Sequence, residues 1–183
     1  MHYVESLLKR IFSIIHICYV KVIHPKRFFF RGISVISNTS HFTINDSGKI
    51  ELGENVGIRR YCEFSVAEKG KIELHKNTFF NNGCMLVSHN MISVGEGTRF
   101  GPNVLVYDHD YDYKNREAFL NGKHISESIF IGKNCWIGAG TILLKGTVIG
   151  NNCVVGAGCV IKGHYGDNVT IVQKRTQSIK ELN

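Results

Sequence analysis

Proline is scarce in this chain, which has two prolines against nineteen glycines among its 183 residues. Such a ratio indicates many tight turns at positive φ and argues against a disordered linker. Long apolar runs are also lacking, because polar residues interrupt the apolar stretch over residues 11–23. That stretch is shorter than the roughly 20 residues of a membrane-spanning helix. No small-residue cleavage site follows it, so we expect no secretory leader and a cytoplasmic protein.

Acidic side chains are nearly absent from residues 1–31, which hold six basic residues and only Glu5. This segment therefore accounts for five of the seven net positive charges of the chain. Residues 3–23 also show helical periodicity. Their apolar face comprises Leu7, Leu8, Ile11, Ile14, Ile15 and Cys18. We predict a basic helical segment over 1–31, which fits peripheral contact with the inner face of the membrane and fits a solvated helix equally well. We expect no nucleic-acid partner.

A six-residue repeat runs through most of the chain. Counting by six gives a large aliphatic residue each time: Ile131, Ile137, Leu143, Ile149, Val155 and Ile161. Four positions after the first five of these stand small residues: Cys135, Thr141, Thr147, Cys153 and Cys159. Shorter runs in the same frame begin upstream at Leu52. Two phases kept for so long indicate a solenoid of stacked repeats.

The spacing within each repeat predicts its geometry. A small residue and the next aliphatic lie two positions apart, so both face the same side of a short strand. The three residues after each aliphatic are often Gly, Asn, Lys or Glu, and glycine and asparagine suit tight corners. Three hexads would close one triangular turn, and successive turns would stack as parallel strands. We predict such a coil over residues 32–166, with a loop insertion at about 110–130 and a C-terminal tail at 167–183.

This pattern resembles the hexapeptide-repeat acyltransferase family, and residues 131–140 look like its most recognisable signature. The resemblance implies an all-β fold, a left-handed parallel β-helix (hexapeptide-repeat solenoid) with a short N-terminal helix and one extended loop. It implies a homotrimer with sites in the clefts between coils. It also implies an enzyme that transfers an acetyl group from acetyl-CoA, as co-substrate, to a sugar or saccharide hydroxyl in surface polysaccharide biosynthesis.

The repeat is interrupted beside His109, which follows Val106 by three residues and stands where a corner is expected. In the resembled family a histidine at the start of such a loop is the catalytic base. The segment Asp108, His109 and Asp110 looks close to the branch that acetylates polysaccharides. We therefore predict His109 as the base and either Asp108 or Asp110 as its orienting acid. The alternative is a histidine that only stabilises a turn.

Substrate contacts are expected around the same corner. His89 occupies the equivalent corner one coil earlier, so the two histidines are expected to stack along one edge. A plain surface position for His89 is the alternative. Tyr107 and Tyr111 flank the predicted base and are assigned to the substrate. The side chain of Asn82, or a backbone amide, could support the oxyanion.

The coenzyme A side is predicted from the resemblance to the family. Trp136 falls at an outward strand position, where it would lie beside the pantetheine arm or else contact another subunit. We predict Gly138 and Ala139 as small residues whose backbone amides a ligand can reach. The remaining predicted contacts are Gly156, Ala157 and Lys162 one coil later, and Lys174 and Arg175 in the tail. The usual Gly-Asn-Pro-Ala tail motif of the family is missing, which puts the phosphate contacts in doubt.

Cysteine pairs of the CxxC type are absent, and five of the six cysteines fall at the small inward position of the repeat. We predict structural filler and a reduced compartment. No two histidines are five residues apart, as a related zinc carbonic anhydrase would need, so we expect no metal.

Two other functions stay open from the sequence. One is a non-catalytic β-helix scaffold, which would leave His109 and Trp136 unexplained. The other is N-acetylation of an amino sugar or an antibiotic-like amine on the same scaffold. Nucleotide-sugar N-acetyltransferases usually add a nucleotide-binding domain. The region before Leu52 lacks the glycine-rich βαβ pattern of such a domain.

Overall fold

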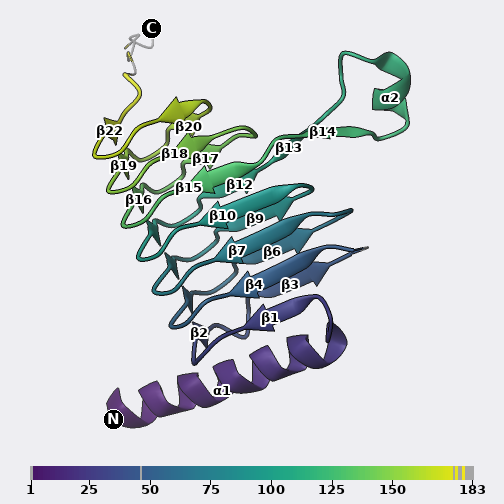
Figure 1. The fold of residues 1–183 in the computed structure, drawn as a ribbon. Helices are drawn as coiled ribbons and strands as arrows, with labels where there is room; N and C mark the ends of the chain where they lie inside the picture. Colours follow the sequence, from purple (N-terminus) through teal and green to yellow (C-terminus); the bar gives the residue numbers. More distant parts are fainter. Residues whose placement is uncertain (1, 46, 175, 177–178, 180–183) are drawn as a thin grey trace, which may run out of the picture.

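Three parallel β-sheets form the faces of a triangular coil in the computed structural model, which describes residues 2–45, 47–174, 176 and 179 (Figure 1). The first face holds β1 (Phe28–Phe30), β4 (Lys49–Leu52), β7 (Lys71–Leu74), β10 (Met91–Val94), β15 (Ile129–Ile131), β18 (Val148–Ile149) and β21 (His164–Tyr165). The second face holds β2 (Val35–Ile36), β5 (Gly57–Ile58), β8 (Phe79–Phe80), β11 (Arg99–Phe100), β16 (Trp136–Ile137), β19 (Val154–Val155) and β22 (Thr170–Ile171). The third face holds β3 (His41–Ile44), β6 (Glu63–Val66), β9 (Met85–Ser88), β12 (Leu105–Tyr107), β17 (Ile142–Leu143) and β20 (Val160–Ile161).

The register confirms that three hexads make one turn in the later coils. Ile131 pairs with Ile149, eighteen residues further along the chain. Every strand pair between successive turns is parallel, as expected when a coil stacks on itself. The fold is the predicted left-handed parallel β-helix. Its strands run from Phe28 to Ile171, so they begin before residue 32 and continue past residue 166.

The interior of the coil is filled as the two-phase pattern predicts. The six aliphatic residues of the hexads expose 3% of their surface or less. The five cysteines at the small positions are buried free thiols. Earlier coils also pack aromatic rings together: the Phe80 ring meets that of Phe64 edge-on at 5.2 Å and stacks on that of Phe100 at 4.5 Å, centroid to centroid. Each coil therefore buries its apolar face only against its neighbours.

The corners depend on asparagine and glycine. Asn134, Asn152 and Asn168 have φ of 55°, 57° and 60°, a left-handed conformation that asparagine tolerates. The Asn152 amide donates to the Asn168 side chain at 3.1 Å, so the corner residues also bond along the stack. At Gly132 an added Cβ would lie 2.4 Å from the Gly150 carbonyl oxygen. Only glycine permits this spacing between coils.

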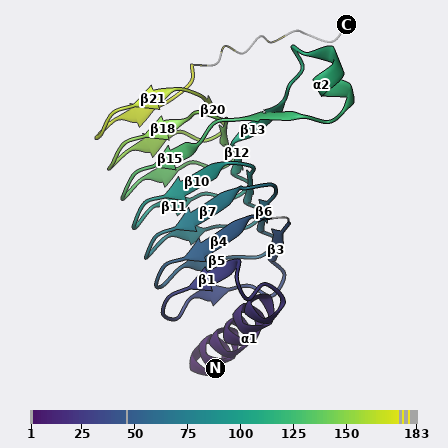
Figure 2. The same ribbon diagram turned by 45° about the vertical axis from the view of Figure 1, so that its right-hand side comes forward.

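Helix α1 (His2–Ile23) lies across one end of the coil (Figures 1 and 2). The buried Ser13 hydroxyl donates to the Ser34 carbonyl at 2.8 Å and accepts from the Ile36 amide at 2.8 Å. Ile17 and Val20 are buried beside it. The outward side exposes large apolar side chains: Leu7, Leu8, Ile11, Phe12, Ile14, Ile15, Tyr19, Val22 and Ile23. Among the described residues no helix is long and apolar enough to cross a bilayer. Membrane contact by this segment stays a prediction.

At the other end, Gln173 takes the place of a further strand. Its side-chain amide donates to the Val160 carbonyl at 2.7 Å and its oxygen accepts from the Val160 amide at 2.9 Å. The edge of β20 is thereby paired.

The predicted loop is a hairpin that projects from the coil after β12 (Figure 1). Strand β13 (His109–Tyr111) pairs with β14 (His124–Ser126) in antiparallel fashion. The connection contains the short helix α2 (Arg116–Leu120), capped by the Asn115 side chain. Because β13 begins at His109, the hairpin rises directly from the corner that holds the predicted base.

Candidate active site

Three histidine rings meet at the corners that join the third face to the first. His89 follows β9 and His109 follows β12, so they lie at the same corner of successive coils. Their rings are stacked, with centroids 3.8 Å apart and planes 21° from parallel. His124, on β14, lies edge-on to both, 4.6 Å from His89 and 5.2 Å from His109. The stacking predicted from the sequence is therefore present, and the hairpin adds a third ring.

Asp108 fixes this corner. Its carboxylate is fully buried and accepts from the His89 amide at 2.8 Å, the Asn90 amide at 2.9 Å and the Ser88 hydroxyl at 2.6 Å. Its Oδ1 also lies 3.3 Å from His109 Nδ1. Burial opposes the charged form, but hydrogen bonds from His109 and from the neighbouring corner hold the pKa of Asp108 below its ordinary value. A charged carboxylate therefore touches the His109 ring.

The second candidate acid points elsewhere. Asp110 is 46% exposed, and its carboxylate lies 3.4 Å from the amine of Lys145, which is only 6% exposed. Among the described residues, His109 contacts the carboxylate of Asp108 and not that of Asp110. Asp108 is thus placed to orient the imidazole, whereas Asp110 ties the hairpin to the next coil.

The two flanking tyrosines have different surroundings. The Tyr107 hydroxyl donates to the sulfur of Met85 at 3.2 Å, and its ring meets His109 edge-on at 6.2 Å. Burial, with a smaller contribution from Glu63, raises the pKa of Tyr107. Tyr111 is 53% exposed and its ring lies 4.6 Å from that of His124. Of the two, Tyr111 has the open surface that a substrate could contact.

Sequence reasoning missed several members of this cluster: Glu68, Ser88, Asn90, His124 and Lys145. The signal for His124 lay in the turn-forming pair Asn121 and Gly122, which predicts that the chain folds back as a hairpin. The other members occupy corners of neighbouring coils and follow from the register once the coil is counted.

The residues predicted for coenzyme A lie on other parts of the coil. Trp136 is 59% exposed on β16, on the face opposite the histidine corner. The Gly138 amide donates to the Val155 carbonyl at 2.8 Å, and an added Cβ would lie 2.5 Å from the Ala157 nitrogen. Glycine at 138 therefore serves coil stacking, and its amide is already bonded. The Ala139 amide has no acceptor among the described residues, and Ala139 itself is partly exposed.

The coenzyme A contacts predicted further along the chain also lie on different parts of the β-helix. Gly156 repeats the Gly138 arrangement, donating to the Ile171 carbonyl at 2.8 Å, and Ala157 beside it is exposed. Lys162 is exposed at a corner between the third and first faces, away from Ala157. Lys174 is exposed beyond β22, and Arg175 lies outside the described residues.

Asn82 stands at a corner between the second and third faces. It lines a groove of about 690 Å³ with Arg60 and Phe79, and its side-chain oxygen accepts from the Arg60 amide at 3.2 Å. The β-helix of one subunit therefore does not bring Asn82 or Trp136 to His109.

The triangular coil, its six-residue period and its interrupted corner are the features expected from the resemblance to hexapeptide-repeat proteins. Residues 128–163 match the family described as bacterial transferase hexapeptide (six repeats). This stretch of the coil is thus similar to the family that the sequence resembles.

Among curated proteins, nodulation protein L of Rhizobium leguminosarum bv. viciae is 34% identical over 70 residues. That match covers 37% of this chain and only 35% of the relative.

Two solved structures share the fold. One is AntD, an N-acyltransferase from Bacillus cereus in complex with dTDP and 3-hydroxybutyryl-CoA, with a TM-score of 0.66, 20% identity and coverage of 87% of this chain and 86% of that one. The other is a maltose O-acetyltransferase from Clostridium difficile 630, with a TM-score of 0.50, 22% identity and coverage of 84% and 71%. At these identities the likeness establishes the fold.

Proposed function

We propose that this protein transfers an acetyl group from acetyl-CoA to a hydroxyl of a sugar or saccharide used in surface polysaccharide biosynthesis. The observation that supports this most is the His109 ring, held between the His89 ring at 3.8 Å and the buried Asp108 carboxylate at 3.3 Å. Such an imidazole, at the start of the hairpin, suits a general base. Two proteins with the same fold support the acyl donor: AntD, an N-acyltransferase in complex with 3-hydroxybutyryl-CoA, and the maltose O-acetyltransferase.

In the proposed reaction His109 removes the hydroxyl proton as the acceptor oxygen attacks the thioester carbonyl. A C–O bond forms, the C–S bond breaks, and the proton passes from the imidazole to the departing thiolate. Because Asp108 Oδ1 faces Nδ1 at 3.3 Å, that nitrogen carries the hydrogen and Nε2 is left to act as the base. The products are the acetyl ester and free coenzyme A.

We propose a homotrimer in which a cleft between the β-helices of two subunits completes the site. Trp136 lies on the face opposite His109, so the two residues can meet only if different copies supply them. In that cleft Trp136 of the partner subunit would flank the pantetheine arm. The Ala139 amide and the lysines 162 and 174 would contact the donor. Tyr111 on the hairpin would contact the acceptor. We propose that the reaction takes place in the cytoplasm.

An amine acceptor is the second candidate, because AntD, with the same fold, is an N-acyltransferase. The hydroxyl and amine acceptors are distinguished by measuring thiol release from acetyl-CoA. The measurement uses pairs of saccharides that differ only in a hydroxyl or an amine at one position. We expect turnover with the saccharide that carries the hydroxyl. Mass spectrometry should identify the product as an ester that mild alkali cleaves. An alkali-stable amide formed only from the amine member would overturn O-transfer. No turnover with any acceptor, together with no coenzyme A binding, would favour a scaffold.

A further inference from the structure

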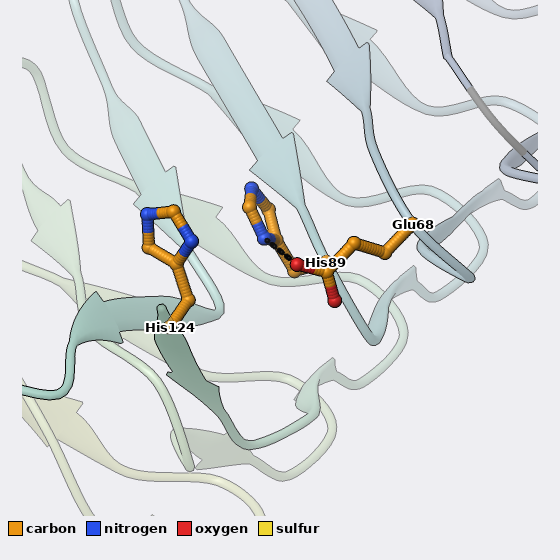
Figure 3. Close-up of side chains that lie close together, drawn as sticks. All are labelled: Glu68, His89 and His124. Atoms are coloured by element: carbon orange, nitrogen blue, oxygen red, sulfur yellow. Dashed lines mark ion pairs between the residues drawn. The ribbon is translucent and has the colours of Figure 1, made fainter. Parts of the chain in front are cut away.

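Beside the proposed base, three side chains from separate segments converge on one point. Glu68 stands at the corner after β6, His89 at the corner after β9 and His124 on β14 of the hairpin. Figure 3 shows the Glu68 carboxylate at one nitrogen of His89, with the His124 ring facing the same imidazole from the hairpin. One ligand atom from each residue lies within 4.8 Å of the other two.

The nitrogen at the centre of this cluster is unsatisfied. His89 Nδ1 is buried, it makes no hydrogen bond among the described residues, and the side chain is only 11% exposed. Glu68 Oε1 lies 3.4 Å away, an ion-pair distance but not a well-formed hydrogen bond. A buried polar atom without a well-formed hydrogen bond costs free energy, so this nitrogen is suited to bind a further ligand.

We propose that Glu68, His89 and His124 form a site for a divalent transition-metal ion of the zinc class. Two imidazoles and one carboxylate are a ligand set that zinc accepts, with a fourth position open to water or another ligand. Calcium and magnesium prefer all-oxygen sites and fit this set poorly. The five-residue histidine spacing considered from the sequence does not apply, because the ligands come from three segments.

A bound ion would join the coil to the hairpin. Glu68 and His89 belong to the coil, whereas His124 belongs to the hairpin that rises from His109. The ion would therefore hold the hairpin in place beside the stacked rings, where the proposed acceptor enters. The site takes no part in the proposed transfer chemistry, and its existence is independent of that proposal.

Metal binding is tested on the full-length protein, stripped of metal, by titration with Co²⁺ followed by visible absorption and by calorimetry with Zn²⁺. We expect one ion per chain. The variants Glu68→Gln, His89→Ala and His124→Ala should each weaken binding by about tenfold or more. His75→Ala and His164→Ala, which change exposed histidines elsewhere, should bind as the unaltered protein does. Equal binding by ligand and control variants, or no stoichiometric binding, would overturn the site.

The tether has its own readout that needs neither donor nor acceptor. Lys114, Arg116 and Lys123 are exposed on the hairpin and offer trypsin cleavage sites. Zinc should slow cleavage there in the unaltered protein and leave the rate in His124→Ala unchanged. The variant thereby also reports any effect of zinc on trypsin itself. Cleavage that zinc slows equally in both proteins would contradict the tether. Because both readouts omit catalysis, their failure would leave the transferase proposal standing.

Discussion

The rings of His89 and His109 lie face to face at 3.8 Å although twenty residues separate them in the sequence. The cause is the register of the coil, which pairs Val87 with Tyr107 and so places the following corners one above the other. Burial, together with the neighbouring imidazoles of His109 and His124, lowers the pKa of His89. His89 therefore presents a neutral ring to its neighbours at neutral pH.

Replacement of Asp108 should destabilise the fold. Asp108→Asn would set an amide donor against backbone N–H groups that now bond a carboxylate. We expect a loss of about 1–3 kcal/mol in the free energy of unfolding, measured by urea denaturation at pH 7. Asp110→Asn, at a half-exposed position, should cost less than about 1 kcal/mol. Equal effects of the two substitutions would contradict the structural role of Asp108.

The difference between Asp108→Asn and the unaltered protein should depend on pH. The folded-state pKa of Asp108 lies below its ordinary value, so its carboxylate contributes stability above the unfolded pKa of roughly 4. That contribution is lost as the pH falls through the folded-state pKa. Unfolding curves of both proteins between pH 7 and pH 2 should therefore converge at the acid end. A gap that stays constant over this range would mean that the carboxylate charge is irrelevant.

The inward and outward positions of the coil can be tested at adjacent residues. Phe80 is fully buried between aromatic rings, whereas Phe79 faces outward and is partly exposed. Phe80→Ala should lower the free energy of unfolding by about 3–5 kcal/mol. Phe79→Ala should cost less than half as much. The reverse order would mean that the strand register is wrong.

Trp136 should affect donor binding alone. Trp136→Ala is expected to weaken coenzyme A binding by about tenfold, which corresponds to the roughly 1.4 kcal/mol of a good aromatic contact. Calorimetry with coenzyme A measures the change, and quenching of the single indole in the unaltered protein provides a second signal. Phe130→Ala, an exposed aromatic on a different face, is the matched control and should bind coenzyme A normally.

Light scattering should give three times the chain mass of 20.6 kDa. Within one subunit His109 and Trp136 lie on opposite sides of the β-helix, so the proposed site requires more than one copy of the chain. A monodisperse monomer that still transferred acetyl groups would contradict the cleft.

The two-phase spacing of interior residues was enough to predict a coil of stacked strands, whereas its left hand came from the family resemblance. His109 and His89 followed from the same count. His124 did not, because its place beside these rings depends on how the hairpin folds back, with Tyr111 opposite His124. No six-residue spacing encodes that contact.

The interpretation of Gly138 from the sequence was incomplete for another physical reason. A glycine at a ligand surface and a glycine under a neighbouring coil look the same in one dimension. The structure shows the second case, with the Gly138 amide bonded to Val155. Among the described residues, the neighbouring Ala139 amide has no acceptor. The pairing of Trp136 with His109 likewise depends on assembly, which a single chain does not encode directly.

The most direct measurement is acetyl transfer by His109→Gln, with coenzyme A release followed over a saccharide acceptor that the unaltered protein uses. Loss of the base should reduce kcat by about a hundredfold or more while coenzyme A still binds with unchanged affinity. Turnover at the rate of the unaltered protein would show that the imidazole stacked on His89 is not the base, and the proposed mechanism would fail.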